Sequence, residues 1–449
     1  MIKNWALAAT IAFFGCVAGA QPSYQKLAAA LYPSNLDDQA FTAKFFNIVE
    51  AHKTSDPFLG GRGPSIAGYR LDKIKFSFMI NVSSATLDLV FFNWSLPIFP
   101  GLELNNDLSD LYGSNVYVMK NLRREAVASQ GIDGRQLTNF SYMFGASYME
   151  DQIKQGAPAG YKVPDEFLDW KPNPNYLDRS TPLRQTLDSH NLVMLSPSKD
   201  VFFDGFGMDV KIRPFMEAQF KQKGGFQNMI MGMMVHEMFH VKEGEDQVNG
   251  LATGRKLACD RQALALQLQN DLKLQSLLNI YEKIIFLLGA DLKFPNTASA
   301  EAEKLADLSV IIRELKSKYP EAWRFIWDYE YTEGFAEYVS AFSMVQVGVT
   351  TLGQKIDLEE NDELNNFTYR TGTIGGLYLV NRLRVSPFAN NEDHSASVWE
   401  LVLLYSQTLQ SSAASDDLIL RYRNISRVNT ANEIKRIVEY LQTTGGSPK

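Results

Sequence analysis

The chain has 449 residues, of which 45% are hydrophobic and 21% are charged, and its formal net charge is −7. This composition is typical of a globular protein and excludes a disordered chain, while the length allows two or three domains. Acidic residues outnumber basic ones by 51 to 44, and lysine and arginine form no dense run. We therefore expect neither nucleic acid nor an anionic membrane as a partner.

The first 20 residues are typical of a secretory signal peptide, with Lys3, an apolar run over residues 5–17 and small residues at 18–20. The apolar run is shorter than a membrane-spanning helix requires, and no later segment has the roughly twenty apolar residues of such a helix. We expect cleavage and export of a soluble protein to the periplasm or the extracellular space. A lipoprotein attached through Cys16 is the lesser alternative. Loss of Cys16 leaves Cys259 as the only thiol, which excludes an intrachain disulfide.

Strand-like patterns characterise the N-terminal region, which we place at residues 21–185. Apolar residues alternate with mostly polar ones over residues 74–83, the period of two of a half-buried strand. Residues 83–85 are expected to turn the chain into a second strand over 87–92, which gives a hairpin. Proline, glycine and asparagine are enriched over 156–182 and indicate a surface connection with a domain boundary.

After this boundary, short apolar runs at 192–195 and 201–203 predict two more strands. From Phe226 onward the apolar spacing is helical. A leucine-rich segment over 257–288 predicts core helices, as does a stripe made of Leu305, Leu308, Ile312 and Leu315. Pro320 suits the first turn of a further helix, and a capping box at 430–433 predicts a last one.

His236, Glu237 and His240 form an H-E-x-x-H motif within an apolar helical segment, and Gly244 is expected to end this helix. Residues four apart on a helix are about 40° apart around its axis, so both imidazoles can face one metal ion. Glu237 lies beside them, where it can act on a water molecule. The chain has only five histidines, which makes chance a poor explanation for this spacing.

A catalytic zinc ion usually takes three protein ligands, so the motif needs a third. Asp246, six residues after His240, is one candidate, but that arrangement needs a glycine where Glu243 stands. Glu333, on a later predicted helix, is the favoured candidate. Glu337 follows one turn later and could accept a hydrogen bond from a ligand histidine. The alternative is that both glutamates belong to a solvated helix face.

Together with the H-E-x-x-H motif, the segment Thr332-Glu333-Gly334-Phe335-Ala336 resembles the gluzincin metallopeptidases, whose third zinc ligand is a glutamate on a later helix. It is similar to the N-E-G-F-A segment of the M1 aminopeptidases within that group, with threonine in place of asparagine. The resemblance implies one zinc ion held by His236, His240 and Glu333, with Glu337 supporting a ligand histidine. The 92 residues between His240 and Glu333 exceed the M1 spacer and are interpreted as a helical insertion over about 245–320.

Two further segments are similar to parts of M1 enzymes. Tyr369-Arg370-Thr371-Gly372 looks like their Y-x-K-G segment, which implies that Tyr369 stabilises the oxyanion, although Thr371 stands where lysine is usual. The segment at 206–210 is similar to the G-x-M-E-N strand that binds a free amino terminus. Its first glycine and final asparagine are missing, so aminopeptidase specificity is not implied.

The resemblance implies an α+β, zincin-like fold with a catalytic domain over residues 186–385 and a C-terminal helical segment over 386–449. The implied activity is zinc-dependent hydrolysis of peptide or protein substrates by an activated water, with Glu237 as the general base. Two alternatives stay open: a catalytically inactive, secreted binding protein of the same fold, and a zinc hydrolase that acts on other substrates. The presence of Glu237 argues against the first of these.

Overall fold

The computed structural model describes the chain in segments that form two compact units. These segments are residues 21–51, 76–81, 86–93, 103–123, 193–195, 225–248, 261–293, 298–361, 367–385, 396–407 and 414–422, with the single residues 214, 217, 220, 221, 387 and 438. The predicted signal peptide, Cys259, the connection at 156–182, the strand at 201–203, the segment at 206–210 and the capping box at 430–433 lie outside them.

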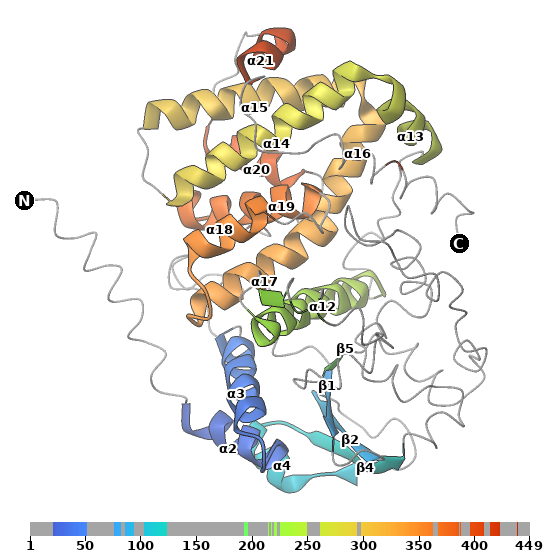
Figure 1. Ribbon diagram of the computed structural model, residues 1–449, viewed down its shortest axis with the longest axis vertical. Helices are drawn as coiled ribbons and strands as arrows, with labels where there is room; N and C mark the ends of the chain where they lie inside the picture. Colours follow the sequence, from blue (N-terminus) through green and yellow to red (C-terminus); the bar gives the residue numbers. More distant parts are fainter. Residues whose placement is uncertain are drawn as a thin grey trace, which may run out of the picture. The chain divides into compact units, whose positions relative to one another are not determined.

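The first unit combines a sheet with three helices (Figure 1). The helices are α2 (Gln21–Leu31), α3 (Leu36–Ala51) and α4 (Asn106–Tyr112), and the strands are β1 (Phe76–Asn81), β2 (Thr86–Phe92), β3 (Glu103–Leu104), β4 (Val116–Arg123) and β5 (Val193–Leu195). The strand order is β3-β4-β2-β1-β5, with antiparallel neighbours except for the parallel pair β1–β5. The predicted β1–β2 hairpin and the strand at 192–195 are confirmed, whereas the helices α2, α3 and α4 were not predicted.

Aromatic side chains form the core of this unit. Phe76 of β1 pairs with Phe92 of β2, and their rings stack with centroids 4.9 Å apart. Phe45 of α3 packs edge-on against Phe78 at 5.5 Å, which holds the helix against the sheet. The prediction of a half-buried strand is wrong at Ser77, because this residue of the opposite face is buried as well. Strand β1 lies between β2 and β5 and is covered on both faces at this position.

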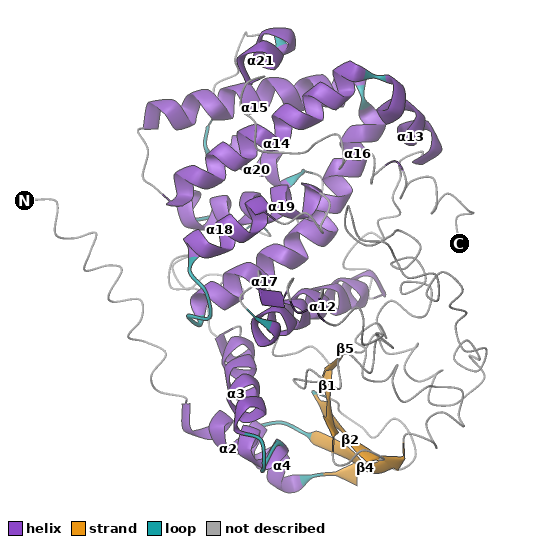
Figure 2. Cartoon of the chain, viewed as in Figure 1, coloured by secondary structure: helices purple, strands orange, loops and turns teal. Residues whose placement is uncertain are grey.

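The described residues of the second unit are helical (Figure 2). The helices are α12 (Phe226–Val248), α13 (Arg261–Asn270), α14 (Leu272–Lys293), α15 (Ala298–Lys318), α16 (Pro320–Tyr329), α17 (Phe335–Gln346), α18 (Leu352–Asn361), α19 (Phe367–Tyr378), α20 (Val398–Tyr405) and α21 (Ser415–Tyr422), with π-helical turns η4 (Glu330–Gly334) and η5 (Leu379–Leu383). With the sheet of the first unit, they confirm a mixed α+β protein. None of these helices combines the length and apolar character needed to cross a membrane.

Sequence patterns anticipate most of these helices. The stripe of α15 is buried along its length, and α16 begins at Pro320 as predicted. The prediction that Gly244 ends the H-E-x-x-H helix is wrong, because α12 continues to Val248. Gly244 is not among the described glycines with positive φ, and a glycine with helical backbone angles is tolerated inside a helix.

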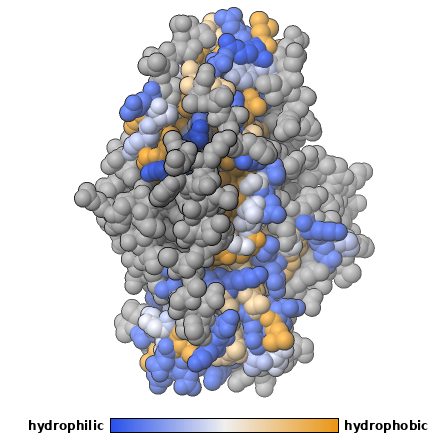
Figure 3. Space-filling model, turned by 90° about the vertical axis from the view of Figure 1, so that its left-hand side faces the viewer, coloured by the Kyte–Doolittle hydropathy of each residue, from blue (hydrophilic) through white to orange (hydrophobic). Residues whose placement is uncertain are grey.

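Large apolar side chains at the described surface are scattered over several elements. Those most exposed are Leu36, Leu104, Leu266, Leu272, Leu404 and Leu420. They belong to α3, β3, α13, α14, α20 and α21. The described residues on the face drawn in Figure 3 mix hydrophilic and hydrophobic side chains. Single exposed leucines of this kind are normal for a globular protein and do not define a docking surface.

Glycines allow three helices of the second unit to approach closely. A Cβ atom on Gly372 of α19 would lie 2.7 Å from the Cα atom of Gly334 and 2.8 Å from the carbonyl oxygen of Glu330. On α12, a Cβ atom on Gly232 would lie 3.1 Å from Oγ of Ser340 in α17. Helix α17 and the turn before it therefore pack tightly between α12 and α19.

We expect Gly372→Ala to lower the free energy of unfolding by about 1–3 kcal/mol or more, because its Cβ atom would meet backbone atoms that cannot rotate away. Gly353→Ala in α18 is the matched control, since a Cβ atom there meets nothing within 4 Å. Alanine at that position should change stability by less than about 1 kcal/mol, in the stabilising direction. Urea denaturation of both variants checks this; equal effects would contradict the tight crossing.

Candidate metal site

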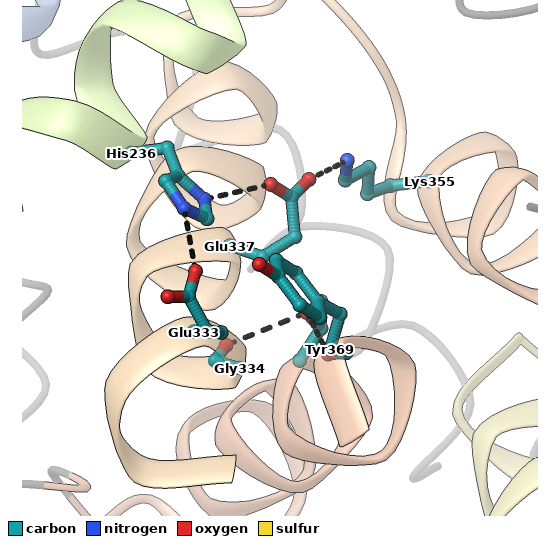
Figure 4. A network of polar contacts seen from close by, with 7 residues as sticks. His236, Glu333, Gly334, Glu337, Lys355 and Tyr369 are labelled. Carbon is teal, nitrogen blue, oxygen red and sulfur yellow. Dashed lines mark hydrogen bonds and ion pairs between the residues drawn. The ribbon is translucent and has the colours of Figure 1, made fainter. Parts of the chain in front are cut away.

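His236 lies on α12 with both ring nitrogens beside a carboxylate (Figure 4). Its Nε2 atom is 3.3 Å from Oε2 of Glu333, and its Nδ1 atom is 3.1 Å from Oε2 of Glu337. The histidine is 8% exposed. The structure thus brings together a histidine and two glutamates that the sequence analysis singled out, although about a hundred residues of chain separate them.

The two glutamates reach His236 from successive turns of one helical segment. Glu333 belongs to the π-helical turn η4, and Glu337 belongs to the first turn of α17. Single π-helical turns within longer helices are rare and are frequent at functional sites. The two ring nitrogens point in different directions. Glu337 contacts Nδ1, and Nε2 therefore faces Glu333. This division matches the roles that the gluzincin resemblance implies.

The distance between Nε2 of His236 and Oε2 of Glu333 suits a shared zinc ion. Zinc binds histidine nitrogen at about 2.0–2.1 Å and carboxylate oxygen at about 2.0–2.2 Å with tetrahedral angles, so two such ligand atoms are about 3.3–3.5 Å apart. A neutral imidazole has one N–H group. When Nδ1–H donates to Glu337, the lone pair of Nε2 faces the Glu333 oxygen. These two electron-rich atoms repel each other. A cation between them would be coordinated by both.

Two other residues of the predicted motif lie on α12, but their side chains fall outside the described part of the structure. Glu237 follows His236 directly, and His240 follows one helical turn later. Among the side chains that the structure describes, no group of three or more histidine, cysteine, aspartate or glutamate residues is arranged to hold a metal ion. Two of the three predicted ligands, His236 and Glu333, lie side by side. Zinc binding by His236, His240 and Glu333 stays a prediction.

The course of α12 bears on Asp246, the other candidate for the third ligand. The helix continues without a break from His236 to Val248. Asp246 comes ten residues after His236, so its backbone position is turned by about 280° around the helix axis and displaced by about 15 Å along it. This position lies on a different face from His236. The geometry of the helix favours Glu333 over Asp246.

Lys355 of α18 contacts Glu337, and no sequence pattern pointed to it. Its Nζ atom donates to Oε1 of Glu337 at 2.6 Å, while Oε2 of the same carboxylate faces His236. Burial raises the pKa of Glu337, but the Lys355 ammonium and His236 outweigh burial and hold this pKa below its ordinary value. Glu337 is therefore a carboxylate with both oxygen atoms engaged.

Tyr369 lies in the first turn of α19 with its ring parallel to that of His236. The two ring planes differ by 8° and the centroids are 6.1 Å apart. Thr373 contacts the carbonyl oxygen of Tyr369 at 2.8 Å and that of Gly334 at 3.4 Å, so its hydroxyl links α19 to the turn that carries Glu333. Figure 4 draws Tyr369 together with His236, Glu333 and Glu337. Tyr369 is thus near the cluster, and its role as an oxyanion donor stays a prediction.

Glu330, three residues before Glu333 in the same π-helical turn, is fully buried. Its Oε1 atom accepts hydrogen bonds of 2.6 Å from Tyr281 and from Thr371. Burial raises the pKa of Glu330 to about 8, although the two hydrogen bonds act in the opposite direction. No sequence pattern identifies Glu330, because one more glutamate in a helical segment carries no signal of burial.

Comparison with models of known families, with characterised proteins and with solved structures found no match to the chain. The gluzincin resemblance therefore rests on the short motifs of the sequence itself. The proximity of His236 to Glu333 and Glu337 is a separate, geometric observation that adds to those motifs.

The buried carboxyl of Glu330 should make stability fall as the pH rises from about 5 to 8. In this window the folded protein keeps a proton that the unfolded chain loses near pH 4.5, so the unfolded state binds fewer protons. Glu330→Gln is neutral at every pH and should remove this dependence, which amounts to about 1 kcal/mol per pH unit.

Urea denaturation at several pH values between 5 and 8 measures the effect. Glu303→Gln is the control, because it removes one carboxyl group from an exposed side chain of α15. This control should keep the pH dependence of the unaltered protein. If the free energy of unfolding depends on pH equally in Glu330→Gln and in the unaltered protein, Glu330 ionises normally in the folded protein.

Proposed function

We propose that the protein is an exported, zinc-dependent peptidase of the zincin-like class, with its zinc site in the second, helical unit. The observation that carries the proposal is the 3.3 Å separation between Nε2 of His236 and Oε2 of Glu333, while Glu337 engages Nδ1. The H-E-x-x-H motif and the gluzincin-like segment support the same ligand pair. The signal-like first 20 residues support export.

A zinc ion held by His236, His240 and Glu333 would supply Lewis-acid activation of a water molecule and of the scissile carbonyl. Glu337 accepts a hydrogen bond from Nδ1–H of His236, which leaves Nε2 as the ligand atom. Glu237, next to His236 on α12, accepts the proton of the attacking water and passes it to the leaving amine. Tyr369 donates a hydrogen bond to the oxyanion, an interaction worth on the order of 3 kcal/mol in other enzymes.

Two other functions are compatible with the same ligand set: an inactive binding protein and a zinc hydrolase for substrates other than peptides. Incubation of the zinc-loaded protein with a diverse peptide mixture, followed by mass spectrometry, distinguishes them from a peptidase. Cleavage within peptides indicates an endopeptidase, whereas loss of single N-terminal residues indicates an aminopeptidase. Intact peptides together with hydrolysis of activated esters would favour the non-peptidase function.

Glu237→Gln should leave the zinc content unchanged and lower peptide hydrolysis by about 10²–10⁴-fold, because it removes the general base but preserves the side-chain volume. Metal analysis and a peptide-cleavage assay on the same preparation measure both quantities. Glu243→Gln makes the same chemical change on the same helix and should retain activity. If Glu237→Gln hydrolyses peptides as fast as the unaltered protein, the proposed mechanism is wrong.

Glu333→Ala should reduce zinc affinity by more than about 100-fold, since it removes a ligand rather than a supporting group. Asp246→Ala should leave the affinity unchanged, because α12 turns this position away from His236. Competition with a chromophoric chelator measures both affinities. The reverse result would identify Asp246 as the ligand.

A further inference from the structure

We infer that Lys355 is a positioning residue for His236, an inference that rests on the proposed function. Polar contacts run from Nζ of Lys355 to Oε1 of Glu337 at 2.6 Å, and from Oε2 of Glu337 to Nδ1 of His236 at 3.1 Å. The chain of contacts ends at Nε2, which faces Glu333 (Figure 4). It connects α18 to the proposed zinc ligand on α12 through α17.

Lys355 fixes the orientation of the Glu337 carboxylate. The terminal torsion of a glutamate is broad, so a carboxylate held at one oxygen can still rotate. With Oε1 bound to Lys355, the same carboxylate presents Oε2 to Nδ1 of His236. A fixed Oε2 favours the tautomer that carries its proton on Nδ1 and leaves Nε2 available as a ligand.

Lys355 also gives Glu337 and Glu333 different roles, one as a hydrogen-bond partner of His236 and the other as a metal ligand. The side chains of Lys355 and Glu337 are only 12% and 17% exposed, so the ammonium offsets the cost of burying the carboxylate. With one oxygen bound to an ammonium and the other to an imidazole, Glu337 is committed to hydrogen bonding. Glu333, which faces Nε2, is then the carboxylate that completes the metal site.

Helix α18 does not depend on Lys355 alone for its place in the bundle. Lys293 of α14 forms an ion pair of 2.5 Å with Asp357, two residues after Lys355. Ile356, between them, is fully buried. Lys293 and Lys355 thus both tie α18 to a neighbouring helix, but only the contact of Lys355 leads to His236. This difference provides a matched control.

Zinc affinity in the full chain tests the inference. Lys355→Met, which keeps most of the stem and removes the charge, should weaken zinc binding about 10–100-fold, the effect typical of losing support for a ligand histidine. Lys293→Met should bind zinc like the unaltered protein, and Lys355→Arg should recover most of the affinity. Unaltered affinity in Lys355→Met, or an equal loss in Lys293→Met, would overturn the inference.

The tautomer of His236 separates this inference from the proposed function. Long-range ¹H–¹⁵N spectra of the zinc-free protein should show the proton of His236 on Nδ1, and Lys355→Met should shift the population toward Nε2–H. If the unaltered protein binds no zinc, the proposed function fails, while this shift would still support positioning by Lys355. An identical tautomer in both proteins would overturn the positioning role.

Discussion

Helix α19 passes directly over the π-helical turn η4 because neither element carries a side chain where they cross. Gly334 follows Glu333 directly, and Gly372 lies three residues after Tyr369. The crossing therefore holds the elements that carry the second proposed ligand and the proposed oxyanion donor side by side. At Gly232, helix α12 likewise approaches α17 closely, and this approach holds the helix that carries His236 beside α17. The site depends on glycines that take no part in its chemistry.

Charged groups inside the helical unit add a second constraint. Arg370 of α19 and Glu282 of α14 form a buried ion pair of 2.5 Å, and the guanidinium lies over the ring of Phe286 at 5.7 Å. A shift of α19 by one turn along α14 would separate this pair and leave two buried charges, at a cost of about 3–5 kcal/mol. The ion pair thus fixes the register of the helix that carries Tyr369.

The sequence anticipates features that follow from local patterns. Strand alternation predicts the β1–β2 hairpin. The helical spacing of apolar residues from Phe226 onward predicts the helix that carries His236. Glu333 was predicted from a short resemblance, and the structure puts it beside that histidine. Lys355 could not be predicted, because its partner is 18 residues away on another helix and a lysine in a polar helix is ordinary. The helix end predicted at Gly244 is wrong, since glycine ends some helices and lies inside others.

The composition of α19 has a consequence for the order of folding. Three of its 12 residues are glycine, and each disfavours a helix by about 1 kcal/mol relative to alanine. A helix of this length and composition is not stable alone in water. It requires the surfaces of α17 and α20, where Tyr338 and Trp399 pack against its glycines. We expect α14 and α15, which are long and adjacent in the chain, to form early and α19 to dock late. The part of the site that carries Tyr369 would then be assembled in one of the last steps of folding.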